Sequence, residues 1–221
     1  MVPGKCLDDV DRPNRKGRVK ACDPAELADR IARLEEQNAR LKRSVARLRV
    51  YRYMAYRDPL TSLWNRRYFE ERLKEEFSRA ERAGIGRSFS VLIVDLNGFK
   101  EINDRYGHLV GDELLKWVGG FLTTHLRTHD VACRTGGDEF MLLLPDVAAA
   151  DAVRVIDRLR VQLRQANLGR TVPVSLSIGS ASWPQVSGSC DMLLARADAA
   201  MYADKRAQKN SPRQKDYRRA A

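Results

Sequence analysis

Two apolar runs that flank a Gly-Gly-Asp-Glu tip place the strongest constraint on how this chain folds. The runs cover residues 131–133 and 140–144, and the tip is Gly136-Gly137-Asp138-Glu139. This pattern predicts a β-hairpin. The two glycines permit positive φ angles and carry no Cβ, so a ligand can lie directly against the backbone at Gly136 and Gly137. The paired carboxylates that follow are suited to holding a hard cation.

The rest of the chain beyond residue 58 alternates between helical and strand patterns. Residues 89–94 form a buried apolar run, and residues 172–178 alternate between apolar and small or polar side chains, so both predict strands. Amphipathic patterns predict helices over residues 68–83, 111–127, 148–166 and 191–206. This alternation predicts an α/β sandwich in which helices flank a mixed sheet, because the hairpin makes part of the sheet antiparallel.

Asp95 and Asp138 are candidate ligands for one metal ion. Asp95 ends the first buried strand, where an isolated carboxylate needs a partner, and Asp138 lies on the hairpin tip. If the two strands are neighbours, both carboxylates reach one divalent cation. Mg²⁺ binds a few carboxylates together with phosphate oxygens and water, which suits phosphoryl chemistry. Taken singly, each acid could instead be a helix cap or part of a surface turn.

Residues 24–57 carry a heptad pattern that predicts a coiled-coil stalk helix. Asp23 and Pro24 are typical of an N-cap and a first helical turn. Asn38 occupies an a position, where paired amides can fix the register of a parallel dimer. Apolar residues fill the other a and d positions, with the coiled-coil period, at Leu27, Ile31, Leu34, Leu41, Val45 and Leu48. The alternative is a single amphipathic helix that packs on its own domain.

The charge of the chain favours anionic ligands. Its net charge of +11 suits nucleotides, nucleic acid or an acidic membrane surface. Much of this charge lies in residues 1–23 and 211–221, which we expect to be disordered basic tails. Basic residues ahead of the heptads raise the alternative of a DNA-binding zipper. However, Pro13, Gly17 and Pro24 interrupt the continuous helix that such a reader needs, so we do not expect nucleic acid as a partner.

Cysteine usage and hydropathy predict a cytoplasmic protein. Cys6, Cys22, Cys133 and Cys190 have no metal-type spacing, so we expect reduced thiols. No apolar run approaches the ~18 residues of a membrane span. The N-terminus also lacks the apolar segment of a secretory signal.

The hairpin residues 136–140 spell GGDEF, and the chain resembles the GGDEF diguanylate cyclases over roughly residues 58–210. Residues 58–67 also match the opening motif D-P-L-T-G-L-x-N-R-R of that family, with Ser62 in place of glycine. The resemblance implies the nucleotidyl-cyclase and polymerase-palm fold. It further implies a homodimer that joins two GTP into cyclic di-GMP with release of two pyrophosphates. The implied cofactor is Mg²⁺, with Mn²⁺ as an alternative.

The resemblance implies that the side chains of Asp95 and Asp138 and the carbonyl of Leu96 bind the metal. It also implies that Glu139 either binds a second metal ion or accepts the proton of the attacking hydroxyl. Asn97 stands where the family has a second aspartate, in the pattern D-x-D-x-F-K. The loop formed by Gly98, Phe99 and Lys100 precedes a predicted helix start, where free N–H groups can cradle phosphates.

Two further motifs point to the nucleotide. Residues 103–112 match N-D-x-x-G-H-x-x-G-D, so Asn103 and Asp112 carry over as guanine readers; helix N-capping is the alternative role of Asp112. Residues 202–210 resemble Y-x-A-K-x-x-G-R-N, so Lys205 carries over as the triphosphate lysine. Lys209 replaces the arginine of that motif and keeps its charge without the bidentate fork, while Gln208 replaces the glycine.

The R-x-x-D pattern of Arg127 and Asp130 lies at the spacing of the family's inhibitory product site, six positions ahead of Gly136. The resemblance therefore implies inhibition by cyclic di-GMP. The alternative function is a catalytically silent GGDEF effector that only binds cyclic di-GMP, although such proteins usually have an eroded hairpin motif.

Overall fold

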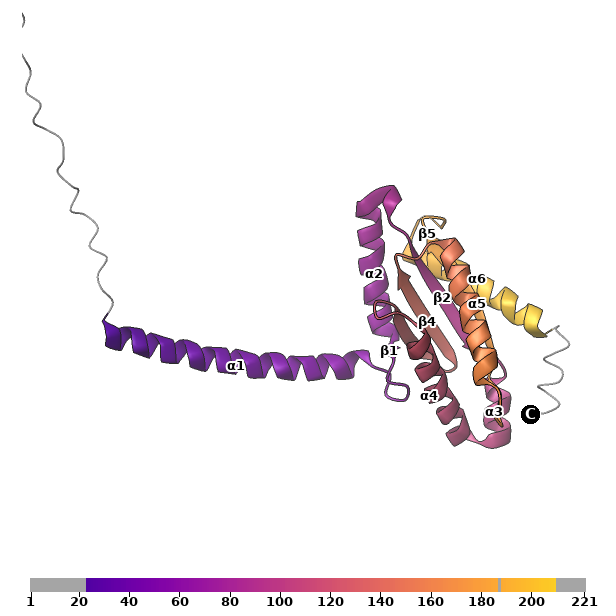
Figure 1. Ribbon diagram of the computed structural model, residues 1–221, viewed down its shortest axis with the longest axis horizontal. Coiled ribbons are helices and arrows are strands. Elements are labelled where there is room, and N and C mark those ends of the chain that lie inside the picture. The colour runs from indigo at the N-terminus through magenta and orange to yellow at the C-terminus, as the bar shows by residue number, and fades with distance from the viewer. Residues whose placement is uncertain (1–22, 187, 210–221) are drawn as a thin grey trace, which may run out of the picture. The chain divides into compact units, whose positions relative to one another are not determined.

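The computed structural model of the protein describes residues 23–186 and 188–209 (Figure 1). Helices and strands alternate along the chain after the first helix. In order they are α1 (Pro24–Tyr56), β1 (Trp64–Asn65), α2 (Arg66–Ala83), a 3-10 turn (Gly84–Gly86), β2 (Phe89–Leu96), α3 (Phe99–Tyr106), α4 (His108–His125), β3 (Val131–Gly136), β4 (Glu139–Pro145), α5 (Ala149–Ala166), β5 (Leu176–Trp183) and α6 (Cys190–Lys209).

The strands form one mixed sheet in the order β1-β3-β4-β2-β5. β3 and β4 form the predicted antiparallel hairpin, β2 pairs antiparallel with both β4 and β5, and the short β1 runs parallel to β3. The predictions of the hairpin and of a helix-flanked mixed sheet are therefore confirmed. The central strand β2 is buried along its whole length, because it has neighbours on both edges and helices on both faces.

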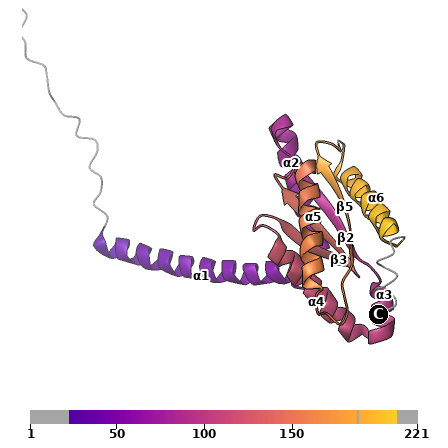
Figure 2. The same cartoon turned by 45° about the vertical axis from the view of Figure 1, so that its right-hand side comes forward.

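Helices cover both faces of the sheet (Figure 2). One hydrophobic core joins α3, α4 and α5 to alternate residues of β2, including Leu92 and Val94. The other core joins α2 and α6 to the intervening residues, including Val91 and Ile93. This division follows from the period of two in a strand, which sends successive side chains to opposite faces. Asp95 continues the second series, so its side chain lies on the α6 face of the sheet.

Residues 23–51 belong to a separate unit from the rest of the chain and are described by themselves. The Asp23 carboxylate accepts a hydrogen bond from the Ala25 amide at 3.0 Å, and α1 begins at Pro24, as predicted. The apolar a and d residues of α1 are exposed, from 46% at Val45 to 65% at Leu48. The expected basic tails, residues 1–23 and 211–221, lie almost entirely outside the described part of the chain. The basic residues that raised the DNA-binding alternative are among them.

The predicted strand over residues 172–178 is wrong at its start, because β5 begins at Leu176. The side chain of Asn167 binds both backbone groups of Val174, with Asn167 Nδ2 2.7 Å from the Val174 carbonyl and the Val174 amide 2.8 Å from Asn167 Oδ1. These bonds replace the ladder that a strand would form. The predicted helix from residue 111 in fact begins at His108, immediately after Gly107 with φ +85°.

Within the described residues, no helix is long and apolar enough to cross a bilayer. Cys133 and Cys190 are free thiols, as expected, and Cys6 and Cys22 lie outside the described residues.

Replacing Ser62 with glycine is expected to stabilise the fold. Ser62 lies at φ +60° in the turn that follows Asp58, and its side chain is exposed. A left-handed conformation costs a residue with a Cβ about 1 kcal/mol relative to glycine, and the larger entropy of an unfolded glycine offsets part of the gain. We expect the thermal midpoint to rise by about 2 °C. Ser62→Ala keeps the Cβ, so a comparable rise in that control would contradict backbone strain as the cause.

Candidate active site

The sheet brings the two predicted metal-binding acids to the same end of adjacent strands. Asp95 on β2 pairs with Glu139 on β4, and Asp138 precedes Glu139 at the hairpin tip. The Leu96 amide also donates a hydrogen bond to the Asp138 carbonyl at 3.2 Å. Asp95 is 5% exposed, Asp138 is half-buried and Glu139 is exposed. The acids are therefore neighbours in space although they lie far apart in the sequence.

Arg134 fixes the hairpin tip, a role that the sequence pattern alone does not give it. Its Nε and Nη2 donate to the Gly137 carbonyl at 3.0 and 2.8 Å, and its Nη1 lies 3.3 Å from Asp58 Oδ1. Burial favours the neutral acid at Asp58, but hydrogen bonds from Thr61 and the charge of Arg134 outweigh it and lower the pKa of Asp58. Arg134 thus ties the tip to the turn that follows α1.

Lys205 of α6 supplies the positive charge that the two acids need. Its Nζ lies 2.6 Å from Asp95 Oδ1. Burial and, to a smaller degree, the nearby charge of Asp95 raise the pKa of Asp138, while Lys205 and Arg134 oppose that rise. The site therefore holds two close acids in a partly desolvated position, an arrangement that costs stability unless a cation is present.

The oxygen atoms of this site fit a hard divalent cation. Asp95 Oδ1 is buried, and among the described residues no group donates a well-aligned hydrogen bond to it, so the Lys205 ammonium is its counter-charge. The described residues contain no group of three or more His, Cys, Asp or Glu placed to hold a metal ion. Two carboxylates and a carbonyl would leave the remaining positions of Mg²⁺ to water and phosphate, as this ion prefers.

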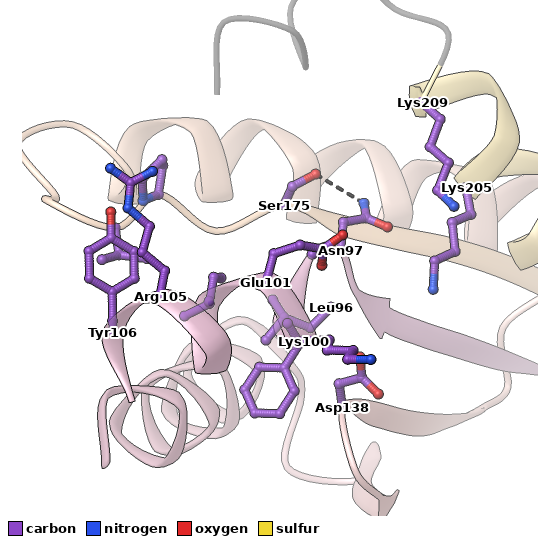
Figure 3. Close-up of a pocket in the computed structure, with 15 residues that line it drawn as sticks. Leu96, Asn97, Lys100, Glu101, Arg105, Tyr106, Asp138, Ser175, Lys205 and Lys209 are labelled. Atoms are coloured by element: carbon purple, nitrogen blue, oxygen red, sulfur yellow. Dashed lines mark hydrogen bonds between the residues drawn. The ribbon is translucent and has the colours of Figure 1, made fainter. Parts of the chain in front are cut away.

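A cavity of about 540 Å³ opens beside the two acids. Figure 3 shows Lys205 and Lys209 reaching from α6 toward the end of β2 and the hairpin. Of the predicted residues, the cavity is lined by Leu96, Gly98, Phe99, Lys100, Asp138, Lys205 and Lys209. Three lysines on the wall of one cavity make it suitable for a polyanion such as a triphosphate.

The predicted guanine readers lie apart from the lining of this cavity. Asn103 Oδ1 is buried and has no hydrogen-bond partner among the residues that the structure describes, and a Cβ on Gly111 would lie 1.9 Å from it. Gly111 is therefore the residue that makes room for Asn103 between α3 and α4. Asp112 is exposed inside α4, which begins at His108, so helix capping does not explain Asp112. Gly136, Gly137 and Glu139 also lie outside the cavity lining.

The predicted inhibitory residues lie on a second cavity of about 330 Å³. The Arg127 amide donates to Asp130 Oδ2 at 2.8 Å, and burial raises the pKa of Asp130. Arg57 and Trp64 line the same cavity, with the Arg57 guanidinium carbon 3.5 Å from the centroid of the Trp64 ring. A cavity with two arginines and an aromatic ring is suited to a nucleotide, and Arg57 had not been expected there.

A family model described as "Diguanylate cyclase, GGDEF domain" matches residues 55–211. The chain belongs to the GGDEF diguanylate cyclase family. This confirms the resemblance seen in the hairpin residues.

Two curated relatives extend the comparison. Response regulator PleD of Caulobacter vibrioides is 33% identical over 91% of this chain and 48% of its own length. Diguanylate cyclase TpbB of Pseudomonas aeruginosa is 38% identical over 85% of this chain and 41% of its own length. The chain thus spans about half, or less, of these relatives.

Solved structures confirm the fold class, including the GGDEF-type sheet with its flanking helices. The coiled coil and GGDEF domain of DgcB from Caulobacter crescentus, in complex with c-di-GMP, has a TM-score of 0.68 at 31% identity and covers 80% of this chain and 94% of that chain. Diguanylate cyclase SiaD from Pseudomonas aeruginosa, in complex with its activator SiaC, has a TM-score of 0.69 at 32% identity and covers 83% of this chain and 70% of that chain.

Proposed function

We propose that this protein condenses two GTP into cyclic di-GMP and releases two pyrophosphates. The observation that carries the proposal is the meeting of Asp95, Asp138 and Lys205 beside a cavity that Lys100 and Lys209 also line. This arrangement supplies ligands for a divalent cation beside a polyanion site, which is what nucleotidyl transfer to an α-phosphate requires. The intact hairpin motif and the named cyclases among the relatives support it.

In this proposal Asp95, Asp138 and the Leu96 carbonyl hold Mg²⁺, or alternatively Mn²⁺. When bound, the metal neutralises phosphate charge and lowers the pKa of the attacking 3′-hydroxyl. We infer that Glu139, which is exposed next to Asp138, receives that proton or contacts a second ion. With Asp95 holding a cation, Lys205 would be free to leave its contact with that carboxylate and bind the triphosphate.

The remaining contacts divide between phosphate and base. Lys100, Lys209 and the N–H groups of Gly98 and Phe99 face the triphosphate from the wall of the cavity. The buried side-chain oxygen of Asn103 and the exposed carboxylate of Asp112 recognise guanine, whose N1–H and N2–H donors adenine lacks. Gly136 and Gly137 leave room for the nucleotide against the hairpin.

Each protomer would bind one GTP, so a symmetric product requires two protomers to face each other. We infer that two copies of α1 form this dimer through their exposed a and d residues.

The direct test of the proposed function incubates the protein with GTP and Mg²⁺ at several protein concentrations and identifies the products. Cyclic di-GMP and pyrophosphate in a 1:2 ratio are expected. Binding of cyclic di-GMP without pyrophosphate release would instead establish the silent effector.

We further infer that Arg127 and Asp130 bind the product and limit its synthesis. Arg127→Ala is expected to weaken cyclic di-GMP binding about 10-fold, because a charged donor to phosphate is lost. Product should then accumulate past the level at which the wild-type reaction stops. Arg164→Ala removes an exposed arginine of α5 and serves as the control. A reaction that stops at the same product level in both variants would contradict the inhibitory assignment.

A further inference from the structure

Three residues that depart from the quoted family patterns contact one another in this structure. Asn97 and Gln208 have been noted above, and Asp204 stands at the alanine of Y-x-A-K. Asn97 Nδ2 lies 3.0 Å from Gln208 Oε1, and Gln208 Nε2 lies 2.8 Å from Asp204 Oδ2. The three side chains connect the loop after β2 to the last turns of α6. We call Asn97, Ser175, Asp204 and Gln208 the α6 clamp.

The orientation of the Gln208 amide follows from its neighbours. Its Nε2 contacts the Leu176 carbonyl at 3.0 Å and the Asp204 carboxylate at 2.8 Å, and these oxygens only accept hydrogen bonds. Gln208 Oε1 must therefore face Asn97 and needs a donor there. Asn97 supplies one, whereas the aspartate of the family pattern has no hydrogen to donate when it is ionised.

The amide of Asn97 takes part in the same network through both its nitrogen and its oxygen. Its Nδ2 also donates to Ser175 Oγ at 3.0 Å, and its Oδ1 accepts from Ser177 Oγ at 2.8 Å. Ser175 Oγ donates onward to Gln208 Oε1 at 3.1 Å. Figure 3 shows the hydrogen bond between Asn97 and Ser175 as a dashed line. Both hydrogens of Asn97 Nδ2 and one lone pair of its Oδ1 are therefore used within this network.

Asp204 anchors the other side of the clamp. Its Oδ2 accepts from the Ile178 amide at 2.9 Å, and its Oδ1 accepts from Arg160 of α5 at 2.8 Å. Asp204 and Gln208 thus cover the outer edge of β5 with polar side chains from one stripe of α6. Lys205 and Lys209 occupy the next stripe, which faces the cavity.

We propose that the α6 clamp positions Lys205 and Lys209 for the triphosphate of the nucleotide. The proposal rests on the function proposed above. Lys209 lies in the last described turn of α6, and terminal turns of helices fray unless side chains bind them. The bonds of Gln208 to Asn97 and to the β5 edge hold this turn, so both ammonium groups face the cavity before the ligand arrives. Asn97 and Gln208 are accordingly positioning residues.

A double-mutant cycle on affinity for GTPαS with Mg²⁺ tests the clamp independently of turnover. Asn97→Asp sets a carboxylate against Gln208 Oε1, and we expect affinity to fall about 10-fold with an unchanged thermal midpoint. Gln208→Ala should weaken affinity to a similar degree. In the Gln208→Ala background, Asn97→Asp should have an effect of less than about twofold, because the clamp is already broken.

Three results would overturn the clamp. A fall that is equally large in both backgrounds would show that the new charge acts on the nucleotide or metal directly. An unchanged or improved affinity in Asn97→Asp would show that Asn97 does not help to position Lys205 and Lys209. Absence of GTPαS binding by the wild-type protein would overturn both this role and the proposed function. Binding without formation of cyclic di-GMP would overturn the proposed function alone, and the cycle would still decide the clamp.

Discussion

Replacing Asp138 with asparagine is expected to reduce pyrophosphate release from GTP by about 1,000-fold, which corresponds to a loss of about 4 kcal/mol of transition-state stabilisation. The substitution removes one of the two carboxylates proposed to hold the metal and keeps the shape of the side chain. The thermal midpoint should stay the same or rise, because burial and the charge of Asp95 raise the pKa of Asp138. A raised pKa in an acid means that its charge costs stability in the folded state.

This pair of outcomes separates a metal ligand from a structural residue. Replacing a carboxylate with a structural role would lower both the stability and the activity of the protein, whereas Asp138→Asn should lower only the activity. The matched control is Asp198→Asn, which removes an exposed acid of α6. Normal turnover in Asp138→Asn, measured by pyrophosphate release over a range of Mg²⁺ concentrations, would end the proposal that Asp95 and Asp138 share a cation.

Local chemistry made the central fold predictable. The hairpin was specified by glycines and apolar runs, and β2 by a segment in which Ser90 is the only polar residue before Asp95. The prediction failed where a side chain outside the segment binds its backbone groups. The Asn167 side chain binds both backbone groups of Val174, so β5 begins only at Leu176. The two-residue strand β1 offered no pattern at all, because its pairing to β3 depends on the turn that precedes it.

In the candidate site, too, residues in sequence motifs could be predicted, whereas roles that depend on contacts between distant segments could not. Motif residues such as Asp95, Asp138 and Lys205 were identified from the sequence, and the structure brings these three together. Arg134 was not, because its role needs the approach of Asp58 from a remote turn. Asn97 and Gln208 looked like two independent losses from the family pattern. Only their contact in three dimensions suggests that each makes the other acceptable.

Disrupting the apolar stripe of α1 is expected to make activity strongly dependent on protein concentration. Leu34 and Leu41 are d positions and are 52% and 62% exposed. Such a stripe on a long helix is costly in water, and burial against a second copy would remove the cost. The double variant Leu34→Glu/Leu41→Glu places like charges in that seam, so we expect monomers by light scattering. Turnover at nanomolar protein should fall about 100-fold, because the tether no longer raises the local concentration of catalytic domains.

The control places the same two charges on the opposite side of α1. Ala32→Glu/Ala39→Glu alters exposed b positions and should leave both dimerisation and turnover unchanged. Raising the concentration of the Leu34→Glu/Leu41→Glu variant should restore activity, since its catalytic residues are intact and the domains still meet by diffusion. A monomeric variant with undiminished turnover at nanomolar concentration would show that α1 does not bring the two nucleotides together.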